Sequence, residues 1–247
     1  MALYRIPGRE NAIHYFPEIE STMDEARNMA QKGCPAFTVV VAEQQRKGRG
    51  RMDRQWVSTK GGLYFTLVLR PDINPADCGR VNFLVSVVLA NLLRKEYHID
   101  AGVKWPNDIL VDGKKIAGML SEMATDGHRV QYLNIGIGLN VNNDPCRVEP
   151  NATTMKMLLG ERVRRTTLLG RFLNLLEEAM VQMTWEQTLA AWRNLTVTLG
   201  RPVRVVTTRE IVEGTAMNVD DTGALILKTT AGTTQKIIYG DCFINPS

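Results

Sequence analysis

Paired cysteines, clustered histidines and long apolar runs are all missing from this 247-residue sequence. Its four cysteines form no C-x-x-C pair, which excludes zinc-finger and thioredoxin-like spacing. Its three histidines are isolated, so we expect no preformed metal site. The longest apolar run, 83–93, stops at Arg94, so it is too short to span a bilayer and predicts a buried helix.

The first residues of the chain lack the continuous apolar stretch of a signal peptide. Scattered thiols and the lack of an export signal together predict a cytoplasmic protein with no membrane partner.

Aromatic residues make up only 6% of the chain, and the formal net charge is only +4. A dedicated nucleic-acid binder usually has a stronger basic charge with interleaved aromatics, so we expect no nucleic-acid partner. The chain does have an ordinary globular composition, 44% hydrophobic and 23% charged, which supports a sizeable core. Its length fits one large α/β domain, or an ordinary domain with a small one.

Helical and strand patterns alternate through the first 195 residues, as in an α/β domain. Thr22 and Glu25 form a predicted capping box, with Thr22 as N-cap of a helix that Gly33 ends. Asp112-Gly113 predicts a hairpin between 109–111 and 115–117, because this dipeptide tolerates positive φ. The other expected strands are 38–43, 63–69 and 133–141, and the other expected helices begin at Pro75, 167 and 186.

The pattern changes after residue 198. From Val203 onward the sequence contains only four short β-prone runs, 203–207, 211–217, 224–227 and 236–238. Turn residues such as Asp220-Asp221-Thr222-Gly223 separate them. This pattern of short strands predicts a small β-barrel over 199–247, which follows an α/β domain over 1–198.

The first candidate for chemistry is the loop from Gln45 to Trp56, which holds five cationic residues and two glycines. Glycine lets a backbone approach a phosphate closely, and arginine binds carboxylate or phosphate oxygens in a bidentate manner. A solvated basic loop or a nucleic-acid patch has the same composition, and composition alone does not separate these interpretations.

The second candidate is Lys104-Trp105-Pro106-Asn107-Asp108, which precedes the predicted hairpin. Strand pairing across the hairpin would bring Asp108 near Lys115, where a partly buried lysine can face an anionic ligand. An ordinary cross-strand ion pair is the alternative.

The third candidate, Gly136-Ile137-Gly138-Leu139-Asn140, lacks the third glycine of a dinucleotide fingerprint, and no helix is expected directly after it. The sequence contains no P-loop either. These glycines are better explained by close packing over a ligand or a neighbouring strand.

Taken in order, these segments resemble the biotin–protein ligase family from about residue 12 to the C-terminus. The resemblance implies an α/β fold: a mixed β-sheet flanked by helices, like a class II synthetase catalytic domain, with a small SH3-like barrel at the C-terminus. It rests on Glu20-Ser21-Thr22, on Gln45-x-x-Gly48-Arg49-Gly50-Arg51 with Trp56, on Lys104 to Asp108, on Lys115-x-Ala117-Gly118, and on Gly136-x-Gly138-x-Asn140.

The resemblance also implies roles for individual residues. Biotin would be bound by Ser21, Thr22, Met23, Gln45, Arg49, Gly50, Arg51, Trp56, Lys115 and Gly118. The nucleotide would be bound by Arg49, Arg51, Asn107, Asp108, Lys115 and Asn140. Catalysis would rest on Lys115, Arg49, Arg51 and Asp108.

The implied reaction activates biotin with ATP to biotinyl-5′-AMP and transfers it to a lysine of a biotin carboxyl carrier protein. Mg²⁺ would be held by the nucleotide rather than by a protein cage. Some relatives begin with a DNA-binding domain of about sixty residues, whereas only about twenty residues precede Ser21 here. We therefore expect the type without that domain. Monomer and homodimer both occur in the family, and the sequence does not separate them.

The sequence departs from the family pattern at three positions. Met23 stands where many relatives have asparagine, and Met52-Asp53 stands where relatives often have Arg-Gly. Asp53 removes a glycine hinge and adds a negative charge to the loop. Gln44 and Gln45 are both present, and spacing to Gly48 favours Gln45 as the residue that contacts the ureido ring.

Three other functions are the alternatives. A lipoate or octanoate ligase would need a long apolar tunnel, whereas Ser21, Thr22 and Gln45 suit a polar ring. A nucleic-acid-binding module would need aromatics among the basic residues of the loop. A non-catalytic biotin-binding protein is disfavoured because Arg49, Arg51 and Lys115 are all present.

Overall fold

The computed structural model describes residues 6, 8–9, 11–52, 54–146 and 148–244. The chain divides into two compact units, and each unit is built from two segments. The first unit contains Met1–Cys78 and Val111–Leu175, and the second contains Gly79–Leu110 and Leu176–Ser247. The domain boundary expected between residues 198 and 199 stays a prediction.

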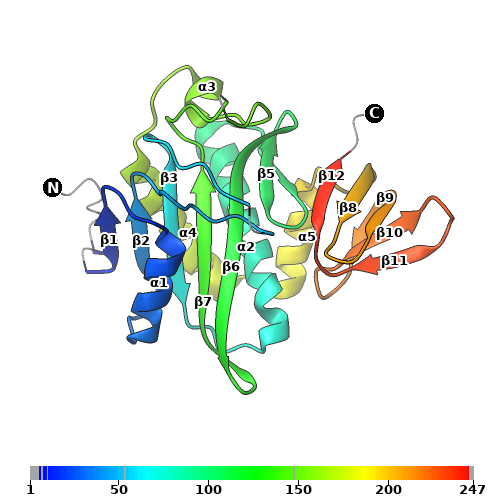
Figure 1. Cartoon of the computed structure of the whole chain (residues 1–247), viewed down its shortest axis with the longest axis horizontal. Coiled ribbons are helices and arrows are strands. Elements are labelled where there is room, and N and C mark those ends of the chain that lie inside the picture. The colour runs from blue at the N-terminus through cyan, green and yellow to red at the C-terminus, as the bar shows by residue number, and fades with distance from the viewer. Residues whose placement is uncertain (1–5, 7, 10, 53, 147, 245–247) are drawn as a thin grey trace. The chain divides into compact units, whose positions relative to one another are not determined.

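The first unit is organised around a mixed sheet. Within it the strand order is β1-β2-β3-β7-β6, where β1 pairs with β2 in parallel and the remaining pairs are antiparallel (Figure 1). Strands β2 and β3 are buried along their whole length, as their continuous apolar sequences predict. The strands are β1 Ile13–Phe16, β2 Thr38–Ala42, β3 Leu63–Leu69, β6 Lys114–Asp126 and β7 Arg129–Leu139.

Helix α1, Thr22–Gln31, packs on β2, β3 and β7. The predicted capping box is wrong: Ser21 is the N-cap, and its side chain makes no cap hydrogen bond in the described structure. Thr22 is instead the first helical residue, and its hydroxyl donates to the Gln45 side chain. The predicted end is confirmed, because Gly33 has φ +83° just beyond the last turn.

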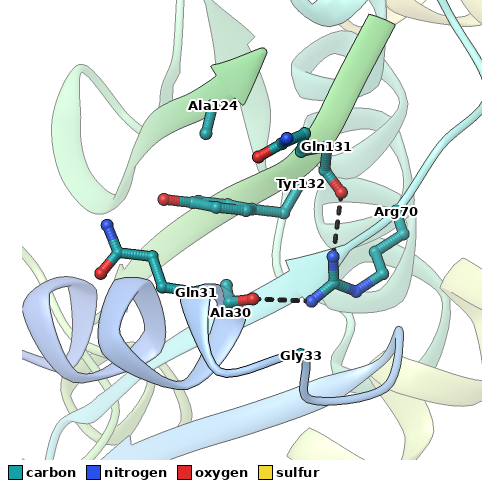
Figure 2. A pocket seen from close by; sticks show the side chains of 7 residues that line it. All are labelled: Ala30, Gln31, Gly33, Arg70, Ala124, Gln131 and Tyr132. Atoms are coloured by element: carbon teal, nitrogen blue, oxygen red, sulfur yellow. Dashed lines mark hydrogen bonds between the residues drawn. The ribbon is translucent and has the colours of Figure 1, made fainter. Parts of the chain in front are cut away.

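The C-terminal end of α1 is fixed by Arg70. Its guanidinium donates to the carbonyl oxygens of Ala30 at 2.8 Å and Gln131 at 3.0 Å (Figure 2). A cation at this end complements the helix dipole. The adjoining hollow of about 500 Å³ contains none of the predicted site residues and is lined by Ala30, Gln31, Gly33, Arg70, Ala124, Gln131 and Tyr132.

Helix α3 and the part of helix α4 up to Leu175 complete the first unit. Helix α3, Met155–Leu159, begins at Thr154, whose side chain accepts a hydrogen bond from the Met157 amide. Helix α4, Arg165–Gln182, places Phe172 edge-on against Phe65 of β3, with ring centroids 5.7 Å apart. Arg165 pairs with Glu43 at 2.9 Å and also donates to the Gly62 carbonyl, so the start of α4 is bound to the turn before β3.

The second unit contains α2, Cys78–Tyr97, from Gly79 onward. The segment Pro75–Tyr97 is long and apolar enough to cross a membrane by length and composition, but 61% of its most apolar window is buried inside the protein. In the second unit Phe83 of α2 packs on Trp185 and Trp192, with centroids 5.6 and 4.9 Å apart. The segment therefore has the burial of a core helix, as the sequence predicts.

The rest of the second unit is an antiparallel β4–β5 pair, helix α5 and a five-stranded antiparallel sheet of order β11-β10-β9-β8-β12. Four of these five strands were expected, and β12 was missed. Trp105 donates from its indole nitrogen to the Gly223 carbonyl at 3.0 Å, in the turn before β10. The elements are β4 Gly102–Lys104, β5 Asp108–Val111, α5 Trp185–Leu195, β8 Pro202–Val206, β9 Ile211–Val219, β10 Leu225–Thr229, β11 Thr234–Ile237 and β12 Asp241–Ile244.

Candidate active site

The Gln45 side chain joins the start of α1 to the loop that follows β2. Its Oε1 accepts from the Thr22 amide at 2.8 Å and from the Thr22 hydroxyl at 3.0 Å, and its Nε2 donates to Ser58 Oγ at 2.9 Å. Thr66 on β3 donates to the Thr22 hydroxyl at 2.9 Å. Ser21 Oγ is buried and has no partner among the described residues. A buried polar cluster with an unused hydroxyl is suited to a polar ligand group.

A pair of glycines on β6 and β7 makes room for Trp56. Gly118 lies directly opposite Gly138 in the sheet. A Cβ added at Gly118 would come within 2.9 Å of the Trp56 ring, and one added at Gly138 would overlap the indole. Trp56 Nε1 is buried without a hydrogen-bond partner in the described structure. The close approach predicted at Gly138 is therefore made by the Trp56 side chain.

Met23 extends the same surface. A Cβ at Gly136 would lie 2.8 Å from Met23 Cε and 3.5 Å from Thr66 Oγ1. Gly136 and Gly138 share one face of β7 because successive side chains alternate. Met23, Trp56 and the polar group around Thr22 are thus brought to one face of the sheet.

Lys115 stands at the start of β6, beside this surface. Its Nζ lies 5.2 Å from the centroid of the Trp56 ring. The Lys115 amide donates to the Asn151 carbonyl at 2.8 Å, and its carbonyl accepts from Thr153 at 2.9 Å. The backbone that carries the ammonium group is therefore held by a neighbouring segment.

Asn140, the expected nucleotide contact, is buried beside the start of β6. Its amide donates to the Ile116 carbonyl at 2.9 Å, and its carbonyl accepts from Met155 of α3 at 3.1 Å. Its side-chain Oδ1 accepts from Asn143 Nδ2 at 3.0 Å. Asn140 has a structural role, and its contact with a nucleotide stays a prediction.

The described residues of the arginine-rich loop form a narrow hairpin. The Gly50 amide donates to the Arg54 carbonyl at 2.7 Å, and the Trp56 amide donates to the Gly48 carbonyl at 2.8 Å. The Arg51 carbonyl accepts from the Arg54 amide at 3.1 Å. Asp53, and with it the expected effect of Met52-Asp53, lies outside the described residues.

Arg49 is held by two carboxylates. It lies 3.0 Å from Asp24 on α1 and 2.6 Å from Glu122 on β6. Arg27 pairs with the same two carboxylates, and its hydrogen bond with Glu122 raises the pKa of the Arg27 guanidinium. The loop is therefore connected by charge to both α1 and β6.

Asn107 and Asp108 belong to the second unit, and their proximity to Lys115 stays a prediction. Asp108 pairs with Lys104 at 3.1 Å, and both side chains are largely buried. Burial raises the pKa of the neighbouring Cys242 thiol to about 11.

Sequence reasoning missed Ser58, Thr66, Asp24 and Glu122. Thr66 carried a signal, because it is a polar residue within an otherwise apolar buried strand. The other three have contacts that depend on long-range pairing, which no local pattern reveals.

The described residues contain no group of three or more His, Cys, Asp or Glu side chains placed to hold a metal ion.

Comparison with known families identifies the chain. Residues 15–140 match the biotin/lipoate A/B protein ligase family, and residues 198–244 match the biotin protein ligase C terminal domain. The chain belongs to the biotin/lipoate A/B protein ligase family.

Several relatives and solved structures support this assignment. The chain is 35% identical to the bifunctional ligase/repressor BirA of Bacillus subtilis, over 88% of this chain and 70% of the relative. It is 34% identical to the biotin–[acetyl-CoA-carboxylase] ligase of Paracoccus denitrificans, over 86% and 92%. The biotin protein ligase of Aquifex aeolicus in complex with biotin and ATP superposes with a TM-score of 0.78, at 26% identity over 95% and 99%. The predicted family and α/β fold are confirmed.

Proposed function

We propose that this protein is an ATP-dependent biotin–protein ligase. The observation that carries the proposal is the buried polar group formed by Ser21, Thr22 and Gln45 beside the glycine-lined sheet face. A ureido ring presents both N–H donors and a carbonyl acceptor, so it can pair with hydroxyl and amide groups of this kind. A lipoyl ring has no such donors.

The remaining side chains divide between the two ends of the ligand. Met23, Trp56 and Gly118 form the apolar wall beside the ring and the alkyl chain. Lys115 faces the biotin carboxylate and the α-phosphate. The backbone at Gly50 and the side chains of Arg49 and Arg51 cover these anions, and Asn107, Asp108 and Asn140 contact the nucleotide.

The chemistry proceeds in two displacements. A carboxylate oxygen of biotin forms a bond with the α-phosphorus of ATP while the bond to pyrophosphate breaks. Lys115, Arg49 and Arg51 neutralise the crowded oxygens and the charge that develops in the transition state. The acceptor amine then attacks the carbonyl carbon of biotinyl-5′-AMP, AMP leaves, and the amine proton passes to solvent.

The acceptor is a lysine on a biotin carboxyl carrier protein. We place the enzyme in the cytoplasm, which fits its four free cysteines. Residues 1–198 would form the catalytic domain and 199–247 the barrel.

The test is exchange of labelled pyrophosphate into ATP with biotin, with lipoate, and with neither acid, in the presence of Mg²⁺. Exchange that depends on biotin alone is expected. Exchange with lipoate alone would move the function to the lipoate ligases of the same family. Folded protein that exchanges with neither acid would contradict adenylation.

A further inference from the structure

Four charged side chains connect the arginine-rich loop to the sheet and to α1, and we refer to them as the Arg49 network. Arg49 in the loop lies 3.0 Å from Asp24 and 2.6 Å from Glu122. Arg27 lies 3.3 Å from Asp24 and also pairs with Glu122. Each carboxylate thus binds two guanidinium groups, and each guanidinium binds two carboxylates.

Glu122 is the member of the network anchored in the sheet. It lies on β6 four residues after Gly118, so the two residues share one face of the strand. Its side chain is 23% exposed, less than that of any other network member. A charged hydrogen bond made in partial shelter from solvent, within a network, contributes more than an isolated surface pair.

The other ion pairs of the same loop are different. Arg46 pairs with Glu18 at 2.6 Å, but these side chains are 64% and 49% exposed. Lys47 pairs with Glu20 and is more exposed still. Pairs of this type contribute little to stability, so they hold the loop weakly.

We infer that Glu122 is a positioning residue for the ligand loop, resting on the proposed function. It holds Arg49 and stabilises the folded form of the loop beside the glycine pair, where residues 46–52 and 54–55 are described. A loop whose folded form is favoured in this way loses less conformational entropy when biotin and ATP bind. Removal of the Glu122 charge would transfer that entropy cost to ligand binding.

The test compares Glu122→Gln with Glu18→Gln. Both changes remove one carboxylate that pairs with an arginine of the loop, but only the first acts on the Arg49 network. Trypsin cleavage between Arg46 and Arg54 is measured without ligand by mass spectrometry. The KM for biotin and kcat are measured by pyrophosphate exchange.

Glu122→Gln is expected to speed loop cleavage about fivefold and to raise the KM for biotin about fivefold, with kcat within about twofold of the original protein. Glu18→Gln should leave all three quantities unchanged. High salt should speed cleavage of the original protein toward the rate of Glu122→Gln, because it screens the same charges.

Equal cleavage of the two variants would overturn the inference. A lower KM for Glu122→Gln with unchanged cleavage would also overturn it, because Glu122 would then only compete with the anionic ligand. A fall in kcat that follows a fall in Tm would also overturn it, because Glu122 would then only stabilise the fold. Trypsin cleavage needs no substrate, so this result stays interpretable even if biotin-dependent exchange fails and the proposed function falls.

Discussion

Lys115 combines a fixed backbone with a cationic end that lies 5.2 Å from the centroid of the Trp56 ring. If its role is to stabilise charge in the transition state, Lys115→Ala should reduce biotin-dependent exchange by about a hundredfold or more. The free energy of unfolding should change little, because Lys115 is not part of the hydrophobic core. Exchange kinetics and urea unfolding measure the two quantities.

The neighbouring Lys114 provides a matched control, because it is exposed and carries the same charge. Lys114→Ala should keep nearly full exchange. If Lys115→Ala is as active as Lys114→Ala, Lys115 does not belong to the active site.

Gly138 tests whether Trp56 belongs to the ligand site. Gly138→Ala places a methyl group into the indole, so Trp56 must move away from the Gly118–Gly138 pair. Biotin affinity, measured by titration calorimetry, is expected to fall at least about tenfold. Gly79→Ala is the control, because nothing lies within 4 Å of its Cβ. Unchanged affinity in Gly138→Ala would show that Trp56 does not contact biotin.

At the scale of single elements, local sequence patterns predicted most strands and helices but misplaced those details that depend on distant partners. Thr22 has the local pattern of an N-cap, yet its hydroxyl is bound to Gln45, twenty-three residues away in the chain. Strand β12 was missed because it is four residues long and pairs with β8, nearly forty residues earlier. Tertiary contacts therefore override propensity at both positions.

The arginine-rich loop is the element that we propose retains the intermediate. The resemblance assigns Arg51 to closure over the adenylate, and the backbone around it is already a narrow hairpin. Arg51→Ala is expected to release biotinyl-5′-AMP about tenfold faster, because one of the cations that hold the mixed anhydride in the site is removed. Rapid filtration with labelled biotin measures the release. Retention equal to that of the original protein would show that the loop does not protect the intermediate through this residue.

At the scale of the whole molecule, the order of motifs along the chain predicted the family and the α/β class, whereas the site required the three-dimensional register. The sequence shows Gly118 and Gly138 as separate motifs, and only antiparallel pairing of β6 with β7 places them opposite each other. The same pairing directs Glu122 to the face that carries Arg49. Strand register is a long-range property, so these relations could not be obtained from spacing.

The buried Cys242 thiol makes the free energy of unfolding of the chain depend on pH in the alkaline range. Burial raises its pKa from 9.0 to about 11, so the folded state keeps the proton where the unfolded state has lost it. Because the folded pKa is the higher one, this contribution to stability is fully present below about pH 9 and is lost as the pH rises toward 11. Between about pH 8 and pH 10.5 the free energy of unfolding of the original protein should fall by about 2 kcal/mol more than that of Cys242→Ala. Urea unfolding at the two pH values measures this difference. An equal loss of unfolding free energy in the two proteins would show that the thiol titrates normally in the folded state.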